Sequence, residues 1–102
     1  MFNETPTDLW LVTTTGRWER LERADSMDAG QRWDLMREVL CCELLEPFTV
    51  YADGEVNSVV YCDEEGGMTG LPFNSTASYL RGYPIAGDVV IEAPTAIRDR
   101  LE

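Results

Sequence analysis

Near its start the chain has an apolar run, residues 9–12, and a more polar stretch after Gly16. In residues 8–22, "DLWLVTTTGRWERLE", β-branched and aromatic residues are dense, and Gly16 can supply a turn. This pattern predicts a strand, a turn and a second, more polar strand. We expect this opening hairpin to account for residues 1–25.

The next stretch, residues 26–46, has the periodicity of a helix. Apolar side chains recur at intervals of three and four residues and would form one stripe: Trp33, Met36, Leu40 and Leu44. Ser26 can cap the amino end, although Gly30 weakens the first turn and is consistent with a later start. Pro47 would end the helix, because a proline disfavours helical geometry in the residue before it. The pattern predicts one long helix.

A second hairpin is predicted after this helix. Residues 48–52, "FTVYA", alternate as a strand does, and "DG" at 53–54 is a strong turn signal. Residues 55–62, "EVNSVVYC", then fit the partner strand.

The stretch that follows begins with three consecutive acids, "DEEGGMTGLPFN". We expect Gly66 and Gly67 to take positive φ in a solvated turn. Asn74 or Ser75 can then cap a short helix that Gly82 ends.

The last predicted strand covers residues 87–93, "GDVVIEA", and Pro94 is placed to open a terminal helical turn that runs to residue 102. The predicted order is β-β-α-β-β-α-β-α. This order indicates an α+β fold, with a mostly antiparallel sheet packed on one long helix. Neither a repeat nor a linker interrupts the sequence, so residues 1–102 predict a single domain, in which residues 26–102 form the core.

The chain is strongly acidic, with a formal net charge of −11 over 102 residues. Most of this charge falls in residues 38–92, which hold ten acidic residues and Arg81 as the one basic residue. Direct nucleic-acid binding needs clustered Arg or Lys, so this balance argues against it. The acidity favours solubility and also suits a partner with a basic surface.

Several features predict a cytoplasmic protein without a membrane segment. No apolar run approaches the roughly 20 residues that span a bilayer. The amino terminus, "MFNETPTDLW", has no positive charge ahead of a hydrophobic stretch, unlike a signal peptide. Three cysteines do not resemble a secreted disulfide framework. We expect two of them, Cys41 and Cys42, to be buried structural thiols on the long helix.

The stretch from residue 61 to residue 91 carries an ordered pattern of acids, glycines and prolines. It consists of Asp63-Glu64-Glu65-Gly66, then Gly70, Leu71, Pro72 and Asn74, then Ala77 and Leu80, and finally Gly82, Pro84, Ile85, Gly87, Asp88 and Val89. This pattern resembles the domain-of-unknown-function family numbered 3846, small proteins of phages, plasmids and bacterial genomes. The likeness extends loosely back to about residue 35. It implies a mobile-element setting, a phage above all, and in a phage the protein would act in the host cytoplasm. It implies no activity.

The residue inventory argues against catalysis. The chain has no histidine and no lysine, which excludes Ser-His and Cys-His nucleophiles and Schiff-base chemistry. No carboxylate pair for acid–base work can be singled out among nineteen acids. Asp63, Glu64 and Glu65 are consecutive, so they do not converge easily on a metal ion. We therefore expect a non-enzymatic protein with no metal and no cofactor.

Two positions near the short helix leave alternatives open. Arg81 either pairs with a neighbouring carboxylate or, with Tyr79 and Tyr83, anchors an interface. Asn74 either caps the helix or helps to bind an anion or a base at the helix start. The candidate partner or ligand residues are Asp63, Glu64, Glu65, Asn74, Tyr79, Arg81 and Tyr83.

Two functional hypotheses follow. In the first, an acidic accessory protein of a phage or mobile element binds and modulates a host or defence protein, with its carboxylates imitating nucleic-acid phosphates. In the second, the protein is a small-ligand module that binds or sequesters a nucleotide-type molecule beside Arg81 and Asn74. Acidic surroundings count against the second, because they repel phosphate.

Overall fold

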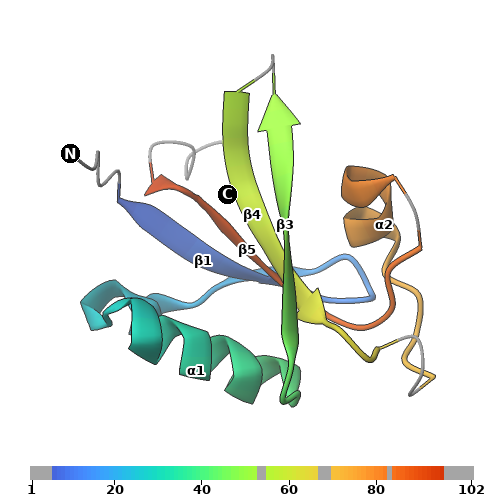
Figure 1. Ribbon diagram of the computed structural model, residues 1–102, viewed down its shortest axis with the longest axis horizontal. Coiled ribbons are helices and arrows are strands. Elements are labelled where there is room, and N and C mark those ends of the chain that lie inside the picture. The colour runs from blue at the N-terminus through green and yellow to red at the C-terminus, as the bar shows by residue number, and fades with distance from the viewer. Residues whose placement is uncertain (1–5, 53–54, 67–69, 83, 96–102) are drawn as a thin grey trace.

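A five-stranded antiparallel sheet organises the computed structural model, which describes residues 6–52, 55–66, 70–82 and 84–95 (Figure 1). The strands are β1 (Thr7–Val12), β2 (Trp18–Arg20), β3 (Leu45–Ala52), β4 (Glu55–Asp63) and β5 (Val89–Pro94), in the spatial order β2-β1-β5-β4-β3. The helices are the 3-10 helix η1 (Glu22–Ser26), α1 (Ala29–Leu40) and α2 (Ser75–Arg81). The predicted α+β class is confirmed.

The opening hairpin forms as predicted. Gly16 takes a φ of 84° in the turn, and β1 pairs antiparallel with β2. Strand β1 also pairs with β5 along its whole length, from Thr7 opposite Pro94 to Val12 opposite Val89. Strand β1 is therefore an interior strand of the sheet, and β2 forms one of its two edges.

Helix α1 is shorter than predicted at both ends. It is capped by Asp28 and not by Ser26: the Asp28 carboxylate accepts from the Gln31 backbone N–H, and the Gln31 side chain accepts from the Asp28 N–H. It ends at Leu40, because Cys41 takes the left-handed conformation with a φ of 51°. The thiols correct another expectation: Cys41 is exposed, Cys42 is half-buried, and both lie beyond the last helical residue.

Pro47 lies inside β3, which corrects the expectation that it ends the helix. Strand β3 is at the edge of the sheet, where a residue without an N–H is tolerated. Strands β3 and β4 form the predicted hairpin, with a register shift between Val50 and Tyr51. The predicted turn at 53–54 lies outside the described residues.

The apolar stripe of α1 also differs from the prediction. Leu35 and Met36 are its buried residues, and Val39 and Leu40 pack beside them. Trp33 is 39% exposed, and Leu44, which lies beyond the helix, is 50% exposed. The buried face of the helix packs against Leu9 and Val90 of the sheet.

The sheet buries apolar side chains on both faces. On one face, α1 and η1 cover a cluster that contains Leu9, Leu45 and Val90. On the other, α2 contributes Ala77 and Leu80 to a cluster with Val60 and Ile91. Figure 1 shows α1 along the lower face of the sheet and α2 to the right of β3.

The end of the chain is described only in part. Pro94 is the last residue of β5, paired with Thr7, so the strand continues one residue beyond the prediction. The predicted terminal helical turn falls largely on residues 96–102, outside the described residues. Within the described ranges, none of the helices has the length and apolar content to cross a bilayer.

Candidate functional site

The acidic stretch after β4 forms the predicted turn. The Glu65 N–H donates to Asp63 Oδ1 at 2.9 Å, and the Gly66 N–H donates to the Asp63 carbonyl at 3.1 Å. The Glu64 N–H donates to the Leu44 carbonyl at 3.0 Å, which ties this turn to the one that follows α1. Backbone and side-chain bonds thus fix the three acids at one end of the sheet.

Gly66 does not take the positive φ that we expected. Gly66 is instead required by the lack of room for a side chain: a Cβ there would lie 2.9 Å from the Ala86 carbonyl oxygen. Such a contact with backbone cannot be relieved by a rotamer change. The position therefore needs glycine because the chain before β5 passes directly over it. Gly67 lies outside the described residues.

The segment "GLPFN" forms a rigid bend against the chain before β5. The Gly87 N–H donates to the Pro72 carbonyl at 2.7 Å, and the Asn74 N–H donates to the Ile85 carbonyl at 2.8 Å. Between them, Phe73 forms an isolated bridge with Ala86. This pairing leaves the side chains of Leu71 and Phe73 at the surface, 38% and 58% exposed.

Asn74 caps α2 and joins three parts of the fold. Its Oδ1 accepts from the Ala77 N–H at 3.0 Å, and its Nδ2 donates to the carbonyls of Val12 at 3.2 Å and Gly87 at 2.9 Å. The residue is 0% exposed. The capping alternative is correct, and the buried side chain is not placed to contact a ligand.

Arg81 pairs with a carboxylate, which was one of its two alternatives. Its Nη1 lies 2.9 Å from Glu46 Oε1, and its guanidinium lies over the Phe48 ring, 4.6 Å from the centroid. Both contacts come from β3, so Arg81 docks α2 against the edge of the sheet. Tyr79 is 88% exposed, and Tyr83 lies outside the described residues.

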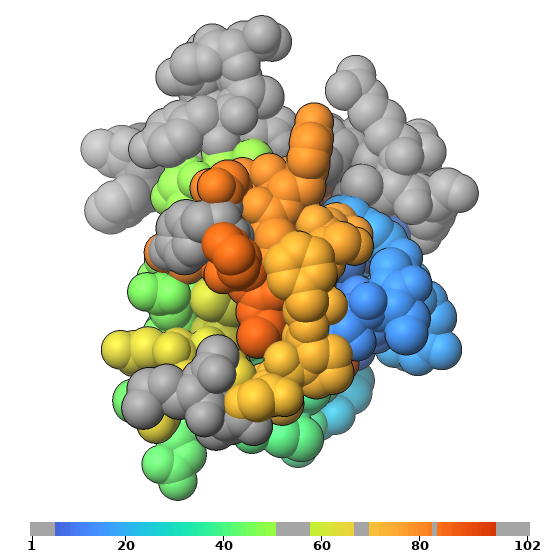
Figure 2. Space-filling view, turned by 90° about the vertical axis from the view of Figure 1, so that its right-hand side faces the viewer, coloured from blue at the N-terminus to red at the C-terminus, as the bar shows by residue number. Residues whose placement is uncertain are grey.

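These segments surround a pocket of about 390 Å³ between the end of β4, the bend and α2. Figure 2 faces this side of the molecule, with the bend and α2 in gold and orange beside the end of β4 in yellow. The pocket is lined by charged side chains and cysteine, Glu46, Cys62, Asp63, Glu64 and Arg81, and by apolar residues, Leu71, Phe73, Pro84, Ile85 and Ala86. Three of the predicted candidates thus meet here: Asp63, Glu64 and Arg81.

The charges of this pocket are unbalanced. Arg81 is neutralised by Glu46, whereas Asp63 and Glu64 form no ion pair with any residue in the described ranges. Burial, and then the neighbouring Glu46 carboxylate, raises the pKa of the Cys62 thiol to about 11, so this thiol stays protonated. The pocket therefore presents an apolar wall with two unneutralised carboxylates at its rim.

This arrangement of charged and apolar groups favours a cationic side chain over an anionic ligand. A phosphate group would face the carboxylates and would find the Arg81 guanidinium already paired. A Lys or Arg side chain suits both parts of the pocket, because its aliphatic stem can lie on apolar surface while its charged head reaches a carboxylate. Among the described residues, no group of three or more acidic or thiol side chains is arranged to hold a metal ion.

Sequence reasoning missed seven of the ten residues that line this pocket. Glu46 lies opposite Cys62 in the β3–β4 register, a pairing that strand alternation could have suggested. No sequence signal pointed to Leu71 and Phe73 as exposed wall residues, because their exposure depends on the pairing of the bend with residues 85–87.

Comparison with known proteins adds no relative: no family model, curated protein or solved structure matches the chain. The resemblance to family 3846 therefore stays a prediction.

Proposed function

We propose that the protein is a non-enzymatic accessory protein that binds and modulates a partner protein. It does so through the pocket between the end of β4, the bend and α2, called the acid-rimmed pocket from here on. This proposal rests on one observation: the pocket combines an apolar wall, built by Leu71 and Phe73, with the unneutralised carboxylates of Asp63 and Glu64. The occupant is a Lys or Arg side chain on a basic surface of the partner.

The surrounding surface supports a partner of the same chemistry. Glu43 and Leu44 precede β3, and the Glu64–Leu44 backbone bond holds them beside the acidic turn. Both are exposed, Leu44 to 50%. Exposed apolar side chains among carboxylates are typical of a binding surface that excludes water at its centre and pairs charges at its rim.

The partner we infer is a host or defence protein whose basic groove normally holds nucleic acid. The charge of residues 38–92 supports this inference, since such grooves are lined by Arg and Lys that a carboxylate surface can engage. The resemblance to family 3846 supports a phage or mobile-element setting in the host cytoplasm. A nucleotide-type ligand is disfavoured by the same carboxylates.

Native mass spectrometry of tagged protein, purified gently from its natural host, tests the proposal. We expect a retained protein that dissociates as salt rises, because pairing between exposed charges is screened within about 8 Å at physiological ionic strength. A retained small molecule would favour the ligand hypothesis. A partner held equally at low and high salt would contradict the imitation of phosphate.

Two variants with the same charge change separate the pocket from the general acidity. Asp63→Asn with Glu64→Gln removes the rim carboxylates, and Glu19→Gln with Glu22→Gln removes two exposed carboxylates elsewhere. We expect the first pair to weaken the complex by about tenfold or more and the second by about twofold. Phe73→Ala should also weaken it. Equal losses for the two pairs would contradict the pocket as the binding site.

A further inference from the structure

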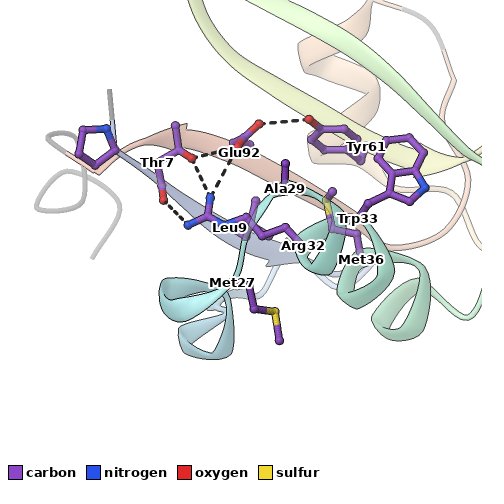
Figure 3. Close-up of a pocket in the computed structure, with 10 residues that line it drawn as sticks. Thr7, Leu9, Met27, Ala29, Arg32, Trp33, Met36, Tyr61 and Glu92 are labelled. Carbon is purple, nitrogen blue, oxygen red and sulfur yellow. Dashed lines mark hydrogen bonds and ion pairs between the residues drawn. The ribbon is translucent and has the colours of Figure 1, made fainter. Parts of the chain in front are cut away.

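A second pocket lies on the opposite face of the sheet, between the first turns of α1 and strands β1, β4 and β5 (Figure 3). Its volume is about 510 Å³, within the range of small-molecule sites. It is lined by Pro6, Thr7, Leu9, Met27, Ala29, Arg32, Trp33, Met36, Tyr61 and Glu92. It shares no residue with the acid-rimmed pocket, so the inference below does not rest on the proposed function.

One side of this pocket is aromatic. The rings of Trp33 and Tyr61 stand at 90° to each other, with centroids 5.9 Å apart. Figure 3 shows them together at one end of the pocket, with Met36 beneath Trp33. Trp33 lines the pocket and is 39% exposed, so its side chain is not part of the buried core. Its ring is available to a ligand.

The other side carries a fixed carboxylate. Glu92 Oε2 accepts from the Thr7 hydroxyl at 2.9 Å, and Oε1 accepts from the Tyr61 hydroxyl at 3.1 Å. Each carboxylate oxygen can accept a further hydrogen bond. Two hydroxyl donors from neighbouring strands therefore hold the carboxylate in place and leave it acceptor capacity toward the pocket.

The nearby guanidinium is committed to the protein. Arg32 donates through Nε to the Ala24 carbonyl at 3.1 Å, through Nη2 to the Thr7 carbonyl at 3.2 Å, and through Nη1 to Thr7 Oγ1 at 2.9 Å. Its Nη1 also forms an ion pair with Glu92 Oε2, at the longer distance of 3.6 Å. Arg32 thus fastens the start of α1 to β1, and these contacts account for all three of its nitrogens.

Two aromatic rings at a right angle and a positioned carboxylate are the groups that recognise an ammonium ion on an apolar body. The field of a chain with a net charge of −11 attracts cations and repels anions. We propose that the pocket between α1 and the sheet binds a small organic cation, an alkylammonium group that contacts the Trp33 and Tyr61 rings and pairs with the Glu92 carboxylate.

Titration with choline chloride tests the site, with ionic strength held constant by sodium chloride and the Trp33 indole N–H followed by NMR. We expect this signal to shift and saturate. Trp33→Ala and Glu92→Gln should each weaken choline binding by about tenfold, as judged by calorimetry. Tyr79→Ala, which removes an exposed aromatic ring outside the pocket, should leave the affinity unchanged.

Three results would overturn the proposal. The first is an indole signal that responds no more to choline than to sodium chloride. The second is a Trp33→Ala protein that binds choline as well as the parent does. The third is tighter binding of inorganic phosphate or butyrate at the same signal, which would assign the pocket to Arg32 and an anion. Should Glu92→Gln fail to fold, Tyr61→Phe replaces it: the ring remains, so we expect a loss of less than about threefold.

Discussion

The side-chain amide of Asn74 donates a hydrogen bond to the carbonyl of Val12, which lies 62 positions earlier in the chain, at 3.2 Å. The same amide binds the Gly87 carbonyl, while its oxygen caps α2. One buried side chain therefore fixes the end of β1, the approach to β5 and the start of α2 relative to one another. The acid-rimmed pocket is built on this junction.

Asn74→Asp should destabilise the protein strongly although aspartate is as good a helix cap as asparagine. The carboxylate would keep the bond from the Ala77 N–H, lose both amide donors and face two carbonyl oxygens in a fully buried position. We expect a loss of about 2–4 kcal/mol in the free energy of unfolding, measured by urea denaturation. Ser75→Ala, at an exposed neighbouring position, should change it by less than about 0.5 kcal/mol. A stable Asn74→Asp protein would show that capping is the only role of this residue.

Gly87→Ala should cost more stability than Gly16→Ala. Both glycines have a similar positive φ, 86° and 84°, so the backbone strain of about 1–2 kcal/mol is matched. They differ in the room available for a side chain. A Cβ at Gly87 would lie 2.8 Å from Leu71 Cδ1, whereas a Cβ at Gly16 would have no such neighbouring atom within 4 Å. Denaturation of Gly87→Ala with and without Leu71→Ala measures the clash directly. If Leu71→Ala brings no relief, steric conflict is not the cause.

Cys41→Gly should stabilise the protein by about 0.5–1 kcal/mol, because Cys41 holds the left-handed position that glycine adopts without steric cost. The side chain is exposed, so little packing is lost. Cys41→Ala is the matched control and should be neutral, since alanine bears the same strain as cysteine. Thermal melting curves of the two variants decide the matter. Equal melting temperatures would contradict strain at this position.

Stability should fall in alkali through Tyr61. Burial, and then the Glu92 carboxylate, raises the pKa of Tyr61 from about 10 to about 12. The unfolded chain therefore loses this proton first, and the folded state binds more protons between the two values. Its contribution is complete below about pH 10 and is lost as pH rises toward about 12, by up to about 2 kcal/mol.

Urea denaturation between about pH 8 and about pH 12 tests this sign, with Tyr61→Phe as the control. The phenylalanine variant should be less stable at neutral pH, since it lacks the bond to Glu92, and should show a shallower decline in alkali. Burial raises the pKa of Cys62 from 9.0 to about 11, so a decline that begins at lower pH should remain in both proteins. An unchanged alkaline slope in Tyr61→Phe would contradict the assignment.

The sequence by itself determined the features that depend on a few neighbouring residues. The strands within residues 8–22 and 48–62, the turn at Gly16, the Asn74 cap and the Gly82 stop were all predicted, because backbone sterics and local hydrogen bonds set them. Together they sufficed for the α+β class and for three residues of the acid-rimmed pocket.

Only the tertiary structure decided the length of α1, the place of Pro47 and the exposure of Trp33. Helical periodicity continues past Leu40, but Leu45 pairs with Asp63 across the hairpin, and that ladder takes the residues a longer helix would need. Arg81 pairs with Glu46 because α2 docks on β3, a contact between segments 35 positions apart. Pairings between residues so far apart in the sequence depend on the packing of the whole sheet, and the local sequence pattern does not predict them.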